Sequence, residues 1–152
     1  MTSISESYEL IKSQIRTAEE KSGRVAGSVE LIAVSKTWPA QVVPELVECG
    51  HRDFGENRVQ ELELKHPDLP SSLRWHFIGH LQKNKVRKVL PFTEKIHSVD
   101  SLDIAKRINS IAHELGLFPK IYIQVNHAKE STKFGFSAEE LSSSFDSLMQ
   151  LD

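Results

Sequence analysis

Residues 31–39, around which the chain is organised, read Leu-Ile-Ala-Val-Ser-Lys-Thr-Trp-Pro. Four apolar residues followed by polar residues and a proline are typical of a short buried strand. Because side chains alternate along a strand, Lys36 should share a face with Ile32 and Val34. A lysine that faces an apolar interior is costly unless it is paired, neutral or covalently occupied. Lys36 is therefore the first candidate functional residue.

Further short strand candidates recur along the chain, and apolar residues at helical spacing follow them. The five predicted strands cover residues 31–35, 51–54, 73–78, 94–99 and 120–125. A helix over residues 7–20 precedes them, and further helices are expected over 39–50, 59–64, 81–90, 101–116 and from Ser137 onward. Pro44 should kink the second of these helices or delay its start.

Regular alternation of strands and helices predicts an α/β fold with a parallel sheet and right-handed crossovers. No glycine-rich phosphate motif follows the first strand, whereas polar or glycine residues follow every strand, which favours a TIM-type (β/α)8 barrel over a doubly wound sheet. Such a barrel needs eight strands and at least about 200 residues. The chain has 152 residues. We therefore expect a single domain over residues 1–152 that is an incomplete barrel with about five βα units.

The bulk properties of the chain exclude several classes of protein. The formal net charge is −2 and there is one cysteine, Cys49, so neither a nucleic-acid-binding protein nor an internal disulfide framework is expected. The first residues do not form a signal peptide, and no apolar run approaches the roughly 20 residues that cross a bilayer. These features predict a cytoplasmic protein without a membrane role.

Lys36 allows two interpretations. A lysine amine in an apolar strand end is nucleophilic and can condense with an aldehyde to give a Schiff base. Alternatively, Lys36 is an ordinary strand-terminal lysine whose ammonium group reaches solvent. Spacing alone favours the second interpretation.

Other candidates follow the later strands, and each has a structural alternative. Asn57 is a hydrogen-bonding group of a pocket or the N-cap of the next helix. His76 either stacks on a planar cofactor inside the barrel or is an ordinary hydrogen-bonded histidine, and Phe77 excludes a zinc-protease motif there. Lys133, in the loop after the fifth strand, supplies positive charge to the site or lies at the surface. No metal ligands or catalytic motif are assigned.

Taken together, several stretches resemble one known family, the pyridoxal-phosphate homeostasis proteins, which are single-domain relatives of the alanine racemase N-terminal barrel. These stretches are residues 33–37 (Ala-Val-Ser-Lys-Thr), 54–61 (Phe-Gly-Glu-Asn-Arg-Val-Gln-Glu), 75–85 (Trp-His-Phe-Ile-Gly-His-Leu-Gln-Lys-Asn-Lys), 97–100 (His-Ser-Val-Asp) and 125–135.

The resemblance implies that Lys36 binds pyridoxal 5′-phosphate as a Schiff base and that Asn57, His76, Asn126 and Lys133 lie near this cofactor. It further implies a carrier or regulator in vitamin B6 and amino-acid homeostasis, without established turnover. The alternatives are a racemase-like enzyme that uses the same cofactor and an interaction fragment that no longer binds it.

The chain departs from the family at its C-terminal end. The resemblance places a Ser/Gly-rich phosphate-binding segment after the later strands, and no segment after Lys133 matches it. We therefore expect a C-terminally truncated member in which cofactor affinity is several orders of magnitude lower, because charge-assisted phosphate contacts contribute about 1.5–3 kcal/mol each.

Overall fold

A single parallel sheet forms the centre of the computed structural model, which describes residues 3–151. Its strands are β1 (Ala33–Val34), β2 (Asp53–Glu56), β3 (Arg74–Phe77), β4 (Lys95–Val99) and β5 (Lys120–Ile123). They lie side by side in the same order as in the sequence, and every neighbouring pair is parallel. A doubly wound sheet would reverse its strand order, whereas a barrel wall does not. The expected incomplete barrel of five βα units is therefore confirmed.

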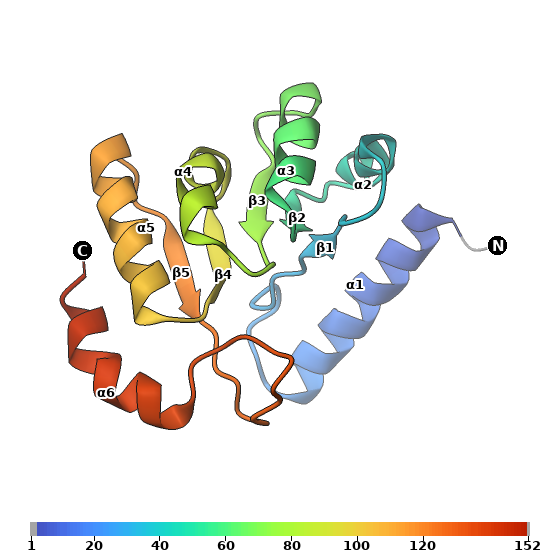
Figure 1. Ribbon diagram of the computed structural model, residues 1–152. Coiled ribbons are helices and arrows are strands. Elements are labelled where there is room, and N and C mark those ends of the chain that lie inside the picture. Colours follow the sequence, from blue (N-terminus) through green and yellow to red (C-terminus); the bar gives the residue numbers. More distant parts are fainter. Residues whose placement is uncertain (1–2, 152) are drawn as a thin grey trace.

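The connecting helices lie along one face of this sheet (Figure 1). They are α2 (Val43–Glu48), α3 (Val59–Lys65), α4 (Val86–Val89) and α5 (Leu102–Leu115), flanked by α1 (Ile4–Lys21) at the β1 end and α6 (Ala138–Met149) beside α5. None of the helices described within residues 3–151 is long and apolar enough to cross a membrane.

The hydrophobic core fills the space between the sheet and these helices. One cluster is built around Phe54 and Trp75, and a larger one around Phe77 and Ile96. These four side chains are each at most 2% exposed, and they point to the helical side because alternate strand residues share a face. The opposite face of the strands is left with mostly polar side chains.

Two helices differ from what simple periodicity predicts. Pro44 occupies the first turn of α2, so the helix begins at Val43 and the predicted delay is confirmed. The predicted helix over 81–90 is wrong in length, because only Val86–Val89 is α-helical and short 3-10 turns flank it. Most of the difference lies at the N-terminal side, where Gln82 has an extended backbone (φ −75°, ψ 143°) and a 3-10 turn over Lys83–Lys85 precedes α4.

Packing around His51 joins the N-terminal helix to the sheet. The His51 ring makes edge contacts with Tyr8 of α1 and Phe54 of β2, with ring centroids 5.3 and 5.2 Å apart. His51 Nε2–H donates to the carbonyl oxygen of Asp53 at 2.7 Å. Burial lowers the pKa of His51, and the hydrogen bond to Asp53 only partly opposes this effect. The folded protein therefore favours the neutral ring.

This lowered pKa predicts a loss of stability at mildly acidic pH. Below its usual pKa of about 6.5, His51 takes up protons more readily in the unfolded chain than in the folded chain, so the free energy of unfolding should fall as the pH falls from 7 to 5. The variant His51→Gln, which keeps a hydrogen-bond donor, should show a smaller fall in urea unfolding experiments. An equally steep fall in this variant would contradict the assignment.

Candidate functional site

Lys36 lies in a tight turn directly after β1. The Trp38 amide donates to the Ser35 carbonyl at 3.1 Å, so residues 35–38 form a β-turn. Lys36 is exposed, and its amine makes no hydrogen bond or ion pair within residues 3–151. The expectation of an apolar surrounding for Lys36 is therefore wrong. Val34, which shares a face of β1 with Lys36, is 48% exposed.

The backbone next to Lys36 is strained. Thr37 has a φ of +66°, in the left-handed region that glycine and asparagine tolerate and β-branched residues rarely adopt. Such a conformation costs on the order of 1–3 kcal/mol and persists only when surrounding contacts enforce it. The turn that presents Lys36 must therefore be held by other residues.

A buried ion pair holds the N-terminal side of this turn. The Lys65 ammonium of α3 donates to Glu56 Oε1 of β2 at 2.5 Å and to the Ser35 carbonyl oxygen at 2.8 Å. The Ser35 hydroxyl donates to the same Glu56 oxygen at 2.7 Å. Glu56 is fully buried and Lys65 is only 5% exposed. The ends of β1 and β2 are thereby joined to α3.

Glu61 of α3 holds the C-terminal side of the turn. Its Oε2 accepts a hydrogen bond from the strained Thr37 amide at 2.8 Å and lies 3.4 Å from the Lys65 ammonium. The hydrogen bond from Thr37 is the main cause that lowers the pKa of Glu61, with burial acting in the opposite direction. Glu61 is therefore held as a carboxylate beside the turn.

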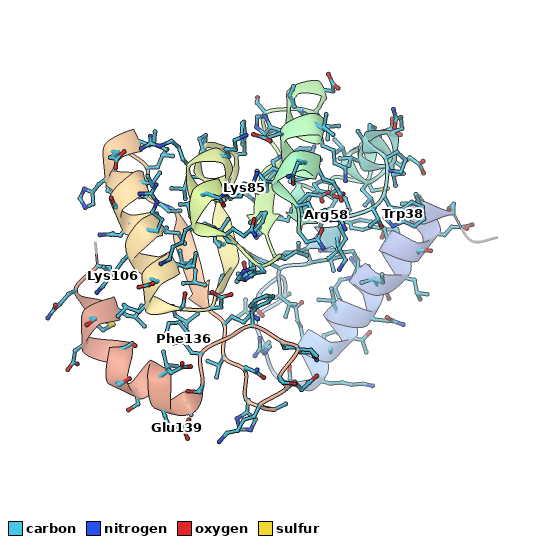
Figure 2. The ribbon with its side chains drawn as sticks, viewed as in Figure 1. Trp38, Arg58, Lys85, Lys106, Phe136 and Glu139 are labelled. Carbon is cyan, nitrogen blue, oxygen red and sulfur yellow. The ribbon has the colours of Figure 1, made fainter. Side chains whose placement is uncertain are left out.

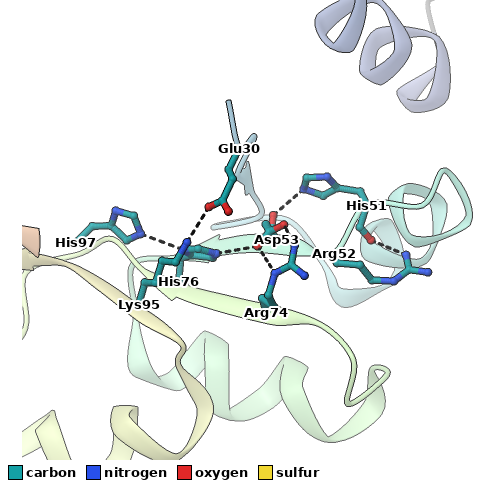
Figure 3. Close-up of polar contacts among 8 residues, drawn as sticks. All are labelled: Glu30, His51, Arg52, Asp53, Arg74, His76, Lys95 and His97. Atoms are coloured by element: carbon teal, nitrogen blue, oxygen red, sulfur yellow. Dashed lines mark hydrogen bonds and ion pairs between the residues drawn. The ribbon is translucent and has the colours of Figure 1, made fainter. Parts of the chain in front are cut away.

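A row of polar side chains crosses the face of the sheet opposite the core helices (Figure 3). Arg74 forms two contacts with the Asp53 carboxylate, which also accepts from His76 Nε2 at 3.1 Å. His76 Nδ1 lies 2.9 Å from His97 Nε2, and the His97 ring stacks on Tyr122 of β5. The row thus links four neighbouring strands.

Charge and burial set the pKa values in this row. Burial alone would raise the pKa of Asp53, but the hydrogen bonds from Arg74 and His76 outweigh burial and lower it. Burial lowers the pKa of His97, and the neighbouring His76 and Lys95 add to the effect. Lys95 forms its own ion pair with Glu30 at 2.7 Å (Figure 3). The face therefore carries fixed polar groups instead of an apolar lining.

Asn57 is placed at the end of β2, next to the strand that leads to Lys36. Its Oδ1 atom is buried and lacks a hydrogen-bond partner among the described residues. The alternative assignment of Asn57 as a helix N-cap is wrong, because Arg58 occupies that position in α3. A side chain at Gly79 would collide with the Asn57 backbone, with a Cβ only 2.2 Å from its carbonyl oxygen. Gly79 therefore allows the ends of β2 and β3 to approach closely.

Asn126 and Lys133 lie together in the loop after β5. The side-chain Nδ2 of Asn126 donates to the carbonyl oxygens of Glu130 and Lys133, at 2.9 and 3.1 Å. The Lys133 ammonium is exposed and pairs with Glu130 at 2.9 Å. The loop is anchored to the β3 end, because Phe134 stacks on His80 with a centroid distance of 3.6 Å.

The structure thus gathers the candidate residues only in part. Lys36 and Asn57 follow adjacent strands at the β1 edge, and His76, which is 1% exposed, is engaged within the polar row. Asn126 and Lys133 follow β5 at the other edge of the sheet.

Sequence reasoning did not identify the residues that hold the Lys36 turn. Glu61 and Lys65 stand four residues apart, a spacing that places them on one helix face and could have indicated a pair. Glu56 sits on the same side of β2 as Phe54, where a carboxylate requires a buried partner. Pairing across β1, β2 and α3 depends on the three-dimensional arrangement and has no local signature.

With this geometry established, comparison with known proteins assigns the chain to a family. Residues 7–152 match the alanine racemase N-terminal domain family. The chain belongs to that family. The pyridoxal phosphate homeostasis protein of Pseudomonas aeruginosa is 40% identical over 153 residues, which cover 99% of this chain and 66% of the relative.

Solved structures agree with this assignment. The structure of PipY from Synechococcus elongatus with pyridoxal phosphate bound is 43% identical, with a TM-score of 0.76, over 91% of this chain and 64% of that chain. An alanine racemase from Clostridium difficile shares the fold at 19% identity, with a TM-score of 0.65, over 94% of this chain and 38% of that chain. The chain spans just under two thirds of the length of the relatives that it matches at about 40% identity.

The buried pair between Glu56 and Lys65 makes a specific stability prediction. Lys65→Met leaves the Glu56 carboxylate buried without its partner and should lower the free energy of unfolding by about 3–5 kcal/mol. The double variant Glu56→Gln/Lys65→Met has no buried carboxylate at position 56. Its free energy of unfolding should therefore fall by less than that of Lys65→Met alone. Urea unfolding of the four proteins of this cycle measures the coupling, and strictly additive losses would show that the two side chains do not interact.

Proposed function

We propose that this chain binds pyridoxal 5′-phosphate covalently through Lys36 and takes part in vitamin B6 homeostasis in the cytoplasm. The observation that carries the proposal is the Lys36 turn. Its amine is unengaged within the described residues, whereas the residues on both sides of it are fixed by Glu56, Glu61 and Lys65. Relatives of about 40% identity that are named pyridoxal phosphate homeostasis proteins support the same function.

The residues around Lys36 suit an aldehyde-bearing cofactor with a polar aromatic ring. When bound, pyridoxal 5′-phosphate supplies an aldehyde carbon that an amine can attack. With this group bound, the deprotonated Lys36 amine would add to the aldehyde carbon, and the aldehyde oxygen would leave as water as the carbon–nitrogen double bond forms. The step therefore needs no oxidant or reductant. Asn57, whose Oδ1 has no partner among the described residues, supplies an acceptor for a hydroxyl of a bound molecule.

Other candidate residues have supporting roles in this proposal. His76 lies within the polar row on the same face of the sheet as Lys36, and its contacts with Asp53 and His97 fix the orientation of its ring. Asn126 orders the loop that carries Lys133, so that the Lys133 ammonium, which pairs with Glu130, is held in the loop after β5. The PipY structure with bound pyridoxal phosphate supports this use of the fold.

Absorbance spectroscopy tests the proposal. Addition of millimolar pyridoxal 5′-phosphate to the wild-type chain should produce an imine band that Lys36→Arg does not produce, because a guanidinium does not form this imine. Lys106→Arg is the matched control, since Lys106 is exposed on α5, far along the sheet from β1 (Figure 2). Circular dichroism should show that both variants are folded. An equal band in Lys36→Arg, or no band in the wild-type chain, would contradict the proposal.

A further inference from the structure

Three charged residues hydrogen-bond to the residues on either side of Lys36. Glu56 and Lys65 bind Ser35 on one side of Lys36, and Glu61 binds Thr37 on the other side. We call Glu56, Glu61 and Lys65 the Lys36 clamp. None of the three makes a hydrogen bond or ion pair with Lys36, and all three lie within residues 56–65, which begin at the last residue of β2, the strand that pairs with β1.

We propose that the Lys36 clamp positions Lys36 for reaction with an aldehyde ligand. This inference rests on the proposed function and names residues that act through the backbone instead of touching the ligand. A lysine side chain has many rotamers, so its amine reaches a fixed point only if its backbone attachment is fixed. The clamp supplies this constraint while leaving the amine free.

The Lys36 clamp stabilises a strained backbone conformation at Thr37. The Ser35–Trp38 turn needs a left-handed residue at its third position, and this chain has threonine there instead of glycine. The hydrogen bond from the Thr37 amide to Glu61 favours that backbone conformation. Without Glu61, the turn should populate other conformations in which Lys36 points elsewhere.

The arrangement of charges explains why the clamp is built from an ion pair and a second carboxylate. The Lys65 ammonium is shared by Glu56, at 2.5 Å, and Glu61, at 3.4 Å. It thereby brings two carboxylates close to the turn, one for the Ser35 hydroxyl and one for the Thr37 amide. Glu61 is the member that can be changed with least risk to folding, because its side chain is 20% exposed and the buried pair remains intact without it.

The test compares the rate at which the wild-type chain and its variants form the Lys36-dependent imine band with pyridoxal 5′-phosphate. Glu61→Ala should slow the reaction about tenfold, the equivalent of one hydrogen bond to a charged acceptor. Glu61→Gln keeps an acceptor oxygen for the Thr37 amide and should remain within about threefold of the wild-type rate. Glu63→Ala is the control on the same helix, because Glu63 pairs with Lys88 and does not contact the turn.

Two further measurements separate positioning from general stability. Amide hydrogen exchange at Thr37, measured without cofactor, should be faster in Glu61→Ala than in Glu63→Ala. In a chain that also carries Thr37→Gly, Glu61→Ala should slow formation of the imine band by a smaller factor, since glycine adopts the left-handed conformation without strain.

Each result either supports or overturns the inference. Equal rates for Glu61→Ala and the wild-type chain, or a Glu61→Gln variant as slow as Glu61→Ala, would overturn the clamp while leaving the proposed function intact. A wild-type chain that forms no Lys36-dependent band contradicts the proposed function itself, and the clamp then has no positioning role.

Discussion

The ion pair between Lys65 and Glu56 is the constraint on which the Lys36 end of the fold depends. Both groups are buried, and removing two charges from water costs several kcal/mol per ion unless each finds charged and hydrogen-bonding partners. Here the partners come from β1, β2 and α3, because Ser35 at the end of β1 contacts both Glu56 of β2 and Lys65 of α3. The pair therefore sets where β1 ends and where the turn with Lys36 begins.

The two faces of the sheet have different physical roles. On the helical face, large apolar side chains such as Phe54, Trp75 and Phe77 are almost completely buried and provide most of the driving force for folding. The other face carries the row from Arg74 to Tyr122, in which hydrogen bonds orient the His76 ring and the His97 ring stacks on Tyr122. The buried apolar face of the sheet thus supports the opposite face, where the polar side chains lie.

Much of the fold could be predicted from the sequence. Five short strand candidates followed by polar or glycine residues could be found in the sequence, and their regular alternation with helices predicted the parallel topology that the structure has. The helix expected over 81–90 is shorter than predicted because periodicity does not register the extended backbone of Gln82 or the 3-10 turn that follows it. The wrong N-cap at Asn57 has a related cause, since a cap depends on a local backbone angle that residue type alone does not determine.

The candidate site was less predictable. Lys36 stood out because a charge at the end of an apolar strand is unusual, but its exposure depends on what covers that face of β1. The pairing of Glu56 with Lys65 has no local signature in the sequence because the two residues lie in separate elements.

The most direct test of the account is the location of the covalent bond. After incubation with pyridoxal 5′-phosphate, reduction with borohydride and proteolysis, mass spectrometry should find the phosphopyridoxyl group on the peptide that contains Lys36. A label spread over exposed lysines such as Lys83 and Lys106, or a label absent from Lys36, would contradict it.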